Sequence, residues 1–506
     1  MTTTMTPARM RTQDEPAGFA RLLRSEWTKL RTVRGWVVGL GLGGVLMVMM
    51  GVLGASAVQL PHEASAVPIG PGGEPVRDGF YFVHQSLTGD GSITVAVSSL
   101  AEQAGMGPGD TQNVTVPWAK AGLIVKESLQ PTSAYAAIMV TASHGVRMQY
   151  DYTHDEAGLR GSVSKTSPRW LRLTRSGGTV TGYNSTDGQT WHKVGTARPA
   201  SLPATVQVGL FVASPDYIEN ATTSSPSIGN AVFGPVDLQG GWRSEAWVGD
   251  ELGGDPQSIT GGYTESPSGF TVRGAGDIAP IVGGIASPGN VVPVEKYLFG
   301  AFAGLIAVII VATTFITAEY RRSLIRTTLT ASPRRGRVLV AKAIVIGSTT
   351  FVIGLIAALV AIGVCEPVAR SNGFTMFPVS WVTELRVVTG TAALLAVAAV
   401  LALAVGSVLR RSTGAVTIVI AAVILPYVLA TSYVLPEGPS NWLLRVTPAA
   451  GFAVQQSIQR YPQVFSAYTP SAGYFPLSPL AGFAVLCGYA LLALGLAVVL
   501  IRRRDA

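Results

Sequence analysis

Residues 298–318 read LFGAFAGLIAVIIVATTFITA, a stretch in which no side chain is charged, and charges return at once in Glu319-Tyr320-Arg321-Arg322. A helix needs about 20 mainly apolar residues to cross the hydrocarbon core of a bilayer. This stretch therefore predicts a membrane-spanning helix. Five further stretches have a similar length and no charged residue in their central portions: 36–60, 339–365, 387–409, 414–435 and 478–501. Together with the quoted run, extended to 296–318, they predict six transmembrane helices.

The composition supports this prediction. Only 13% of the 506 residues are charged, whereas soluble domains carry about 25%. The formal net charge is +8, but the basic residues flank the apolar stretches, which favours membrane orientation over nucleic-acid binding. The two cysteines, Cys365 and Cys487, both lie in apolar stretches. The long polar segment therefore has neither a disulfide framework nor a zinc site of the Cys/His type.

The distribution of arginines predicts the topology. Arginines cluster before the first stretch, in 319–337, at Arg410-Arg411 and in 502–504, whereas the opposite loops carry few. Short loops rich in Lys and Arg face the cytoplasm. We therefore expect both termini in the cytoplasm and residues 61–293 outside. Ala55-Ser56-Ala57 resembles a signal-peptidase site, but the long basic segment and the long apolar run before it favour an uncleaved anchor.

The polar segment has the pattern of a β-domain. Residues 61–79 are rich in Pro and Gly and indicate a linker. Within 80–235, stretches such as 93–97, 171–174 and 206–212 alternate apolar and polar side chains. One-sided alternation predicts antiparallel sheets with one buried face, in a β-sandwich or jelly roll. Residues 236–293 are Gly-rich and we expect them to form an appendage or stalk.

Three stretches in this domain carry a resemblance. Residues 118–128 (WAKAGLIVKES), 170–177 (WLRLTRSG) and 185–191 (STDGQTW) resemble the concanavalin-A-like (laminin-G-like) jelly-roll family. The resemblance implies an extracellular glycan as a partner, and it makes Trp118, Trp170 and Trp191 candidates for stacking on sugars. Aromatic side chains on strands are also common in cores, and that alternative stays open. Glucanases of this fold carry paired acids spaced Glu-x-Asp-x-x-Glu, a pattern that this segment lacks, so we do not expect hydrolysis.

The membrane part lacks the groups that drive transport by itself. The central portions of the stretches contain no ionisable residue, which argues against a proton- or sodium-coupled carrier. No Gly-x-x-x-x-Gly-Lys-Ser/Thr loop is present to hold the phosphates of ATP. A separate subunit would therefore have to supply the energy of transport.

A second resemblance, in the membrane part, implies such an energy-supplying subunit. Residues 26–34 (EWTKLRTVR), 319–329 (EYRRSLIRTTL) and 332–342 (SPRRGRVLVAK) resemble type-2 ABC transporter permeases of high-GC bacteria. The resemblance implies a non-enzymatic subunit without a cofactor, located in the bacterial cytoplasmic membrane. It also implies two ATPase subunits as partners, with a homodimer or a second permease completing the complex. The candidate ATPase-coupling loop comprises Glu319, Tyr320, Arg321, Arg326, Arg334 and Arg335, for which anchoring to lipid headgroups is the alternative.

We expect residues 1–35 to form a cytoplasmic tail and an interfacial helix. Apolar side chains recur at helical spacing from Phe19 to Leu30, and charged ones occupy the other positions, as in helices that lie on a membrane surface. The interfacial candidates are Glu26, Trp27, Lys29 and Arg31.

We therefore expect an α-helical polytopic membrane domain, with spans at 36–60 and within 294–506, and an all-β domain between them. Phe302, Phe315 and Tyr427 are candidates for an apolar cargo path suited to an amphiphilic cargo. The expected function is the permease of an ATP-driven exporter. The alternative is a sensor or mechanical transmitter whose outer domain binds cell-wall glycan without transport.

Overall fold

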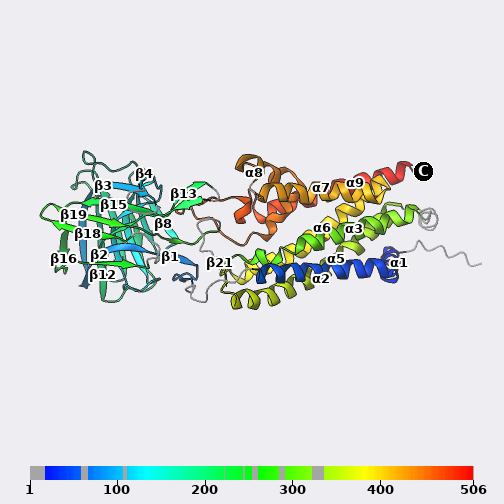
Figure 1. Cartoon of the computed structure of the whole chain (residues 1–506), viewed down its shortest axis with the longest axis horizontal. Helices are drawn as coiled ribbons and strands as arrows, with labels where there is room; N and C mark the ends of the chain where they lie inside the picture. Colours follow the sequence, from blue (N-terminus) through cyan, green and yellow to red (C-terminus); the bar gives the residue numbers. More distant parts are fainter. Residues whose placement is uncertain are drawn as a thin grey trace, which may run out of the picture.

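The computed structural model describes residues 18–57, 67–105, 111–220, 223–242, 245–253, 260–283, 291–321, 335–432 and 434–504. The molecule is elongated, with a β-sandwich at one end and a helical bundle at the other (Figure 1). Helix α1 (Phe19–Thr32) and the C-terminus lie at the end of the bundle farthest from the sandwich. We call this end the terminal end and the opposite end of the bundle the sandwich end.

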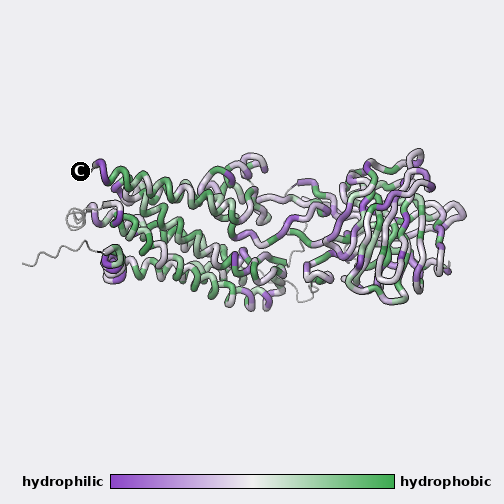
Figure 2. Tube along the Cα trace, turned by 180° about the vertical axis from the view of Figure 1, so that it is seen from behind, coloured by the Kyte–Doolittle hydropathy of each residue, from purple (hydrophilic) through white to green (hydrophobic). Residues whose placement is uncertain are grey.

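Six helices of the bundle are long and apolar enough to cross a membrane. Figure 2 shows hydrophobic residues along their length and hydrophilic residues at the terminal end. This confirms the six predicted spans. The helices are α2 (Arg34–Ser56), α3 (Ala301–Arg321), α5 (Arg335–Ser371), α6 (Trp381–Leu409), α7 (Ser412–Thr431) and α9 (Pro479–Arg504).

Helix α6 is the central helix and packs against α3, α5, α7 and α9. Small side chains such as Ala398 and Ala402 are fully buried along it, which lets the helices approach closely. The same principle applies between α2 and α3. A Cβ at Gly43 would lie 2.9 Å from the Cβ of Ala307, and one at Gly39 would lie 2.8 Å from a methyl group of Val311.

Two antiparallel sheets form the sandwich. In spatial order, the seven-stranded sheet comprises β17 (Val248–Leu252), β2 (Phe80–Thr88), β12 (Thr205–Ala213), β5 (Lys120–Lys126), β6 (Tyr135–Thr141), β7 (Gly145–Tyr150) and β8 (His154–Ala157). The nine-stranded sheet comprises β11 (His192–Ala197), β10 (Thr179–Ser185), β9 (Arg169–Ser176), β3 (Gly91–Ala104), β15 (Ser227–Phe233), β19 (Gly269–Gly274) and β18 (Gly262–Ser266), with β4 (Gln112–Val114) and β16 (Asp237–Gly240) paired to β3. The small strand pair β13 (Tyr217–Asn220) and β14 (Thr223–Ser225) lies outside both sheets.

The predicted alternation places one face of each sheet in a common core. On β12, Val206, Val208 and Leu210 are fully buried between the sheets, as are Leu171 and Leu173 on β9. The predicted fold class, an all-β sandwich joined to a polytopic helical domain, is thereby confirmed.

The predicted boundaries need one correction. Residues 237–274 are not a separate appendage, because β16, β18 and β19 belong to the nine-stranded sheet and β17 pairs with β2. The segment completes the sandwich because its short strands supply edge strands and cover the core with Phe270 and Val272. Within the predicted linker, β1 (Val76–Asp78) pairs with β20 (Ile278–Pro280).

The β1–β20 ribbon covers the outer face of the seven-stranded sheet. Aromatic side chains, among them Phe80, Phe82 and Phe211, form a second core beneath it. Two lysines of β5 are buried there, each against one aspartate. The Nζ atom of Lys120 donates to Asp277 at 2.6 Å, and that of Lys126 donates to Asp78 at 2.7 Å. The chain is thus fastened to the sheet both where it enters and where it leaves the sandwich.

A third core joins the sandwich to the bundle. Val67, Ile281 and Val282 of the two connecting segments pack against Phe377, from the α5–α6 loop, and against residues of the α8–α9 connection, including Ile458, Val464 and Tyr474. We call this group the junction core. Gln463 donates hydrogen bonds to the carbonyls of Tyr152 (3.3 Å) and Thr153 (3.1 Å) in the sandwich.

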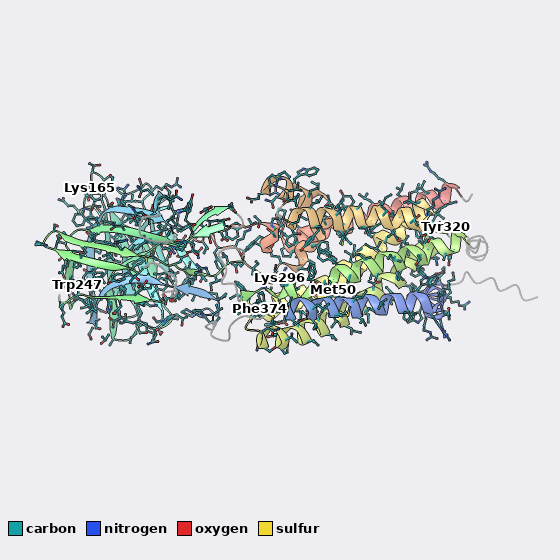
Figure 3. All side chains as sticks on the ribbon, viewed as in Figure 1. Met50, Lys165, Trp247, Lys296, Tyr320 and Phe374 are labelled. Carbon is teal, nitrogen blue, oxygen red and sulfur yellow. The ribbon has the colours of Figure 1, made fainter. Side chains whose placement is uncertain are left out.

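Short elements complete the sandwich end of the bundle: η1 (Val294–Leu298), α8 (Glu437–Val446), η2 (Pro448–Gln455) and η3 (Pro470–Ala472). Strand β21 (Val291–Val292) pairs in parallel with β22 (Thr375–Met376). Lys296 and Phe374 lie at this end of the bundle, and Tyr320 lies at the terminal end (Figure 3).

Candidate functional site

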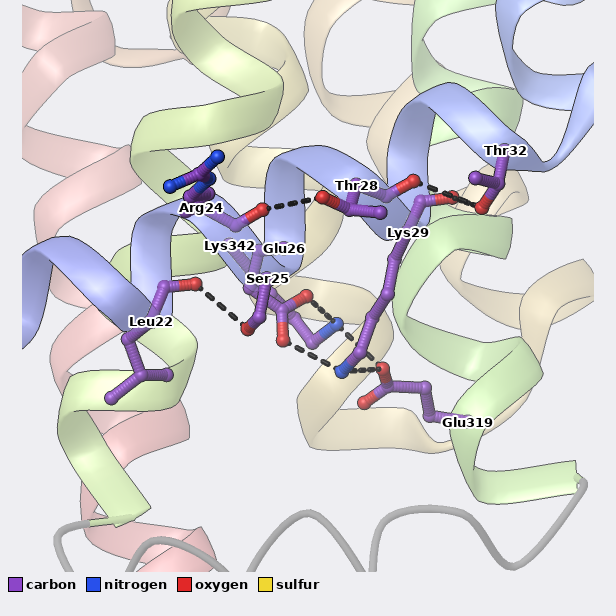
Figure 4. Close-up of polar contacts among 9 residues, drawn as sticks. All are labelled: Leu22, Arg24, Ser25, Glu26, Thr28, Lys29, Thr32, Glu319 and Lys342. Atoms are coloured by element: carbon purple, nitrogen blue, oxygen red, sulfur yellow. Dashed lines mark hydrogen bonds and ion pairs between the residues drawn. The ribbon is translucent and has the colours of Figure 1, made fainter. Parts of the chain in front are cut away.

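Four charged side chains meet at the terminal end of the bundle, where α1 lies against α3 and α5 (Figure 4). We call Glu26, Lys29, Glu319 and Lys342 the charge cluster. The Nζ atom of Lys342 donates to Glu26 at 2.5 Å and to Glu319 at 2.7 Å. That of Lys29 donates to Glu26 at 2.7 Å and to Glu319 at 3.0 Å. Each lysine thus bridges the same two carboxylates.

The cluster is buried except at one corner. The side chains of Glu26, Lys342 and Glu319 are 0%, 1% and 8% exposed, whereas that of Lys29 is 37% exposed. Buried ion pairs add little net stability, because desolvation offsets their attraction, but removing one partner costs about 3–5 kcal/mol. The cluster therefore specifies how α1 sits on α3 and α5 more than it stabilises the fold.

Aromatic side chains shield the cluster from the rest of the bundle. The Nζ atom of Lys342 lies 4.5 Å from the ring centroid of Phe315. Trp36 packs edge-on against Phe315, with 5.0 Å between ring centroids. Such apolar cover strengthens the electrostatic interactions beneath it. Burial alone lowers the pKa of Lys29, but Glu26 and Glu319 outweigh this effect, so its pKa lies above the ordinary value.

A further contact ties the end of α3 to the turn between α6 and α7. The guanidinium of Arg410 lies 5.0 Å from the ring centroid of Tyr320. Arg410 has a φ of 59°, in the left-handed region, and it ends α6. The terminal ends of α1, α3, α5 and α6 are thus linked through polar or cation–π contacts.

The structure brings together residues that the sequence placed in two separate groups. Glu26 and Lys29 were predicted for the interfacial helix and Glu319 for the coupling loop. Glu319 is a buried member of the cluster and is not presented on a surface. Trp27 and Arg31 are exposed on α1, as a membrane-surface helix requires. Arg326 and Arg334 lie outside the described residues, and for Arg321 and Arg335 the structure gives only the helical backbone.

Lys342 was not predicted as a site residue. The sequence feature that could have identified it is its position as a single cation inside an apolar run of α5. A charge at such a place needs a partner within the protein.

The three candidates for a cargo path lie in two places. Phe302 and Tyr427 meet at the sandwich end, with ring centroids 4.9 Å apart. Phe452 of η2, which was not predicted, lies 5.1 Å from Phe302 and 4.3 Å from Tyr427. Phe315 is instead part of the cover of the charge cluster. We call Phe302, Tyr427 and Phe452 the aromatic plug.

The three tryptophans predicted to bind sugar differ in their exposure to solvent. Trp118 is 3% exposed and stacks on His144 with 4.0 Å between centroids. The prediction of Trp118 as a sugar contact is therefore wrong, because a buried ring cannot offer a face to a ligand. Trp170 and Trp191 are partly exposed on the nine-stranded sheet. Among the described residues, no group of His, Cys, Asp and Glu could hold a metal ion.

Comparisons with known proteins support the helical part. A family model described as "ABC-2 family transporter protein" matches residues 205–506, which is more than half of the chain. No curated protein matches the chain.

Solved structures resemble the chain over a minor part of its length. A functionally unknown protein from Saccharomyces cerevisiae is 16% identical, with 35% of this chain and 83% of that chain covered and a TM-score of 0.23. The GH43 protein BlXynB from Bacillus licheniformis is 14% identical, with 29% and 27% covered and a TM-score of 0.19. Scytalido-glutamic peptidase is 9% identical, with 40% and 98% covered and a TM-score of 0.25. Scores this low carry no argument about function.

Proposed function

We propose, from the premise that this chain belongs to the ABC-2 family of transporter proteins, that it is the membrane-spanning subunit of an ATP-driven exporter. Membership makes it a multi-pass permease component of an ABC transporter. The proposal adds a direction of transport and a separate pair of ATPase subunits that supply the energy. The observation that carries it is the charge cluster, which joins α1 to α3 and α5.

The terminal end is the cytoplasmic end in this proposal. Arginines gather there, in keeping with the rule that basic loops stay inside. The sandwich then lies outside the cell. The partner permease is a second copy of this chain or another permease, and the cargo passes between the two.

Coupling would begin at the chain between α3 and α5, which contains the proposed coupling-loop residues Arg326 and Arg334. This chain leaves α3 two residues after Glu319 and enters α5 seven residues before Lys342. A push from an ATPase on it would act on both helices, and the cluster would pass the movement on to α1. The neutralised interior of the cluster lets the helices move together without exposing a charge to lipid.

The aromatic plug would close the opposite end of the path. Its three rings come from α3, α7 and η2, so a relative movement of these elements separates them. An apolar plug without charged groups fits an amphiphilic cargo and disfavours a free ion.

The test is a variant that removes every buried charge of the cluster together: Glu26→Gln, Glu319→Gln and Lys342→Met. Neutral groups of similar shape should preserve the fold, because no buried charge is left unpaired. Purified with its ATPase and placed in vesicles, this variant should still bind the ATPase but lose most cargo-stimulated ATP hydrolysis. The control is Arg503→Gln, an exposed basic residue of α9, which should behave as the wild type. Full stimulation in the triple variant would refute the coupling role.

A second function is favoured by the junction core. The sandwich is fastened to the α8–α9 connection through Gln463 and the apolar residues of that core, so movement of the bundle would also move the sandwich. This arrangement suits a mechanical transmitter that works without cargo. ATP-dependent accumulation of an amphiphile in inverted vesicles supports the exporter, whereas ATP hydrolysis that responds only to a ligand of the sandwich supports the transmitter.

A further inference from the structure

Backbone strain in the sandwich gathers at the end that faces the bundle. Among the described residues other than glycine, four have a positive φ, and three of these lie in two loops of the seven-stranded sheet. Thr132 (69°) lies between β5 and β6, and Asp151 (43°) and Tyr152 (61°) lie between β7 and β8. The four strands are antiparallel neighbours, so both loops emerge from the same end of the sheet. Figure 1 shows β8 on the side of the sandwich next to the bundle.

Tyr152 is the least expected of these residues at a positive φ. Asp tolerates the left-handed region because its short side chain can bond locally, whereas a bulky residue rarely adopts it. The Tyr152 side chain is buried and packs edge-on against Tyr135, with 4.9 Å between ring centroids. The carboxylate of Asp151 accepts from the backbone N–H groups of Tyr135 at 3.4 Å and Ala200 at 3.1 Å. These contacts hold the β7–β8 turn in a conformation that its backbone disfavours.

Gln463 of the α8–α9 connection holds the same turn from the helical part. Its buried Nε2 atom donates to the carbonyl oxygens of both Tyr152 (3.3 Å) and Thr153 (3.1 Å). One amide group therefore bonds two successive carbonyls of a left-handed turn. Hydrogen bonds weaken steeply with distance and angle, so a displacement of about 1 Å would break both.

We propose that Gln463 and the β7–β8 turn form a latch with two states. In the docked state, Gln463 bonds the left-handed turn and fixes the sandwich on the bundle. In the released state these bonds are absent, and the turn relaxes toward a negative φ. The hydrogen bonds favour docking and relief of strain favours release. Because the two effects oppose each other, a small movement of the α8–α9 connection can select either state.

The junction core allows such a movement. On the side of the sandwich it consists of Val67, Ile281 and Val282, which lie in the connecting segments and not in the two large sheets. The sandwich can therefore tilt about these segments while the junction core stays packed. The latch goes beyond the proposed function, because docking and release require neither ATP nor cargo and can be measured on the chain alone.

The test measures the distance between sandwich and bundle in the purified full chain by pulsed electron paramagnetic resonance. The native cysteines are replaced (Cys365→Ala and Cys487→Ala), and spin labels are attached to Arg198→Cys, just after β11, and Gly438→Cys in α8. Both labelled positions are exposed, and a Cβ at Gly438 would meet no atom within 4 Å.

Gln463→Glu should shift the distances toward those of the released state, because a carboxylate cannot donate to carbonyls. The ratio of released to docked protein should rise roughly tenfold, as expected for the loss of two hydrogen bonds. Gln463→Met, which removes the donor without adding a charge, should give the same shift. The matched control is Gln459→Glu, the same change at an exposed position of the same connection, which should leave the distances unchanged.

A second pair of variants tests the strain. Asp151→Gly and Asp151→Val both remove the carboxylate, but glycine accepts a positive φ and valine does not. The released fraction should therefore be roughly fivefold larger in Asp151→Val than in Asp151→Gly. The proposal is overturned if the two fractions are equal, if neither Gln463 variant shifts the distances, or if Gln459→Glu shifts them as much as Gln463→Glu.

Discussion

Lysine is buried in two regions of this molecule, and the two regions use it differently. In the sandwich, Lys120 and Lys126 each meet a single aspartate of the chain that enters or leaves the domain. In the bundle, Lys342 lies between two glutamates that also share Lys29. A one-to-one buried pair can only be made or broken, so it works as a fixed attachment. A shared network can lose one contact and keep others, which suits a place where helices move.

The largest effect should follow from Lys342→Ala, because it leaves two buried carboxylates facing each other. Loss of one partner of a buried ion pair costs about 3–5 kcal/mol, and here Lys29 at the exposed corner is the only cation left in the cluster. We expect poor yield and a strongly lowered midpoint of thermal unfolding in detergent. Adding Glu26→Gln and Glu319→Gln to Lys342→Met should recover most of the loss. A stable Lys342→Ala protein would contradict this prediction and would mean that Lys29 alone can compensate both glutamates.

A smaller loss should follow from Lys126→Met, which leaves only Asp78 without a cation. Asp78 keeps the hydrogen bond from the backbone N–H of Thr132 at 2.8 Å, so we expect about 3 kcal/mol. The measurement is the unfolding midpoint of the sandwich, followed by β-type circular dichroism. The double variant Asp78→Leu with Lys126→Met should restore stability. If it is as unstable as the single variant, then packing and not the lone charge explains the loss.

A gain of about 1 kcal/mol should follow from Glu102→Gln at pH 8, because Glu102 is a buried carboxylate without a lysine. Its Oε1 atom is buried without a hydrogen-bond partner, and burial raises its pKa to about 7. The folded state therefore holds a proton that the unfolded state releases near pH 4.5. Stability contributed by this group is present below pH 4.5 and is lost as the pH rises to about 7. Unfolding midpoints at pH 5 and pH 8 should differ less in Glu102→Gln than in the wild type, and an equal difference would contradict the prediction.

The smallest effect should come from Lys29→Ala. More than a third of this side chain is exposed, so solvent screens its charge and the loss should stay below about 1 kcal/mol. Lys342 continues to donate to both glutamates, at 2.5 Å to Glu26 and at 2.7 Å to Glu319. Thermal unfolding in detergent should therefore barely change. A loss of stability as large as that of Lys342→Ala would show that the two lysines contribute equally. The expected difference between the buried Lys342 and the partly exposed Lys29 would then be wrong.

The six spans could be predicted because length and hydropathy alone determine which segments enter a bilayer. The sandwich was predictable up to 235 because its longer strands alternate clearly. The strands from 237 to 274 were missed because each is short and glycines interrupt them, such as Gly249 within β17 and Gly253 just after it. Their position is determined by pairing with β2, β3 and β15. Such long-range pairing cannot be predicted from the local sequence pattern.

The candidate site was predicted only in part. Glu26 and Lys29 were selected as charged positions of the predicted interfacial helix, and Glu319 was selected because its loop resembles that of type-2 ABC permeases. Their partnership was not predictable, since Glu26 and Lys342 are 316 positions apart and tertiary packing alone brings them together. For the aromatic plug, Phe302 and Tyr427 were selected by position in their spans, whereas Phe452 lies in a loop whose entry into the bundle has no simple sequence signal.

Helix α5 reaches from the charge cluster to the strand that leaves the sandwich. It contains Lys342 near one end and extends to Ser371, just before β22, which pairs with β21. At about 1.5 Å per residue, the distance from Lys342 to Ser371 is about 44 Å. Such a rod works as a lever: a tilt of about 10° at the cluster displaces the far end by about 8 Å. The same lever works in reverse, so a force on the sandwich would act on the charge cluster as a torque.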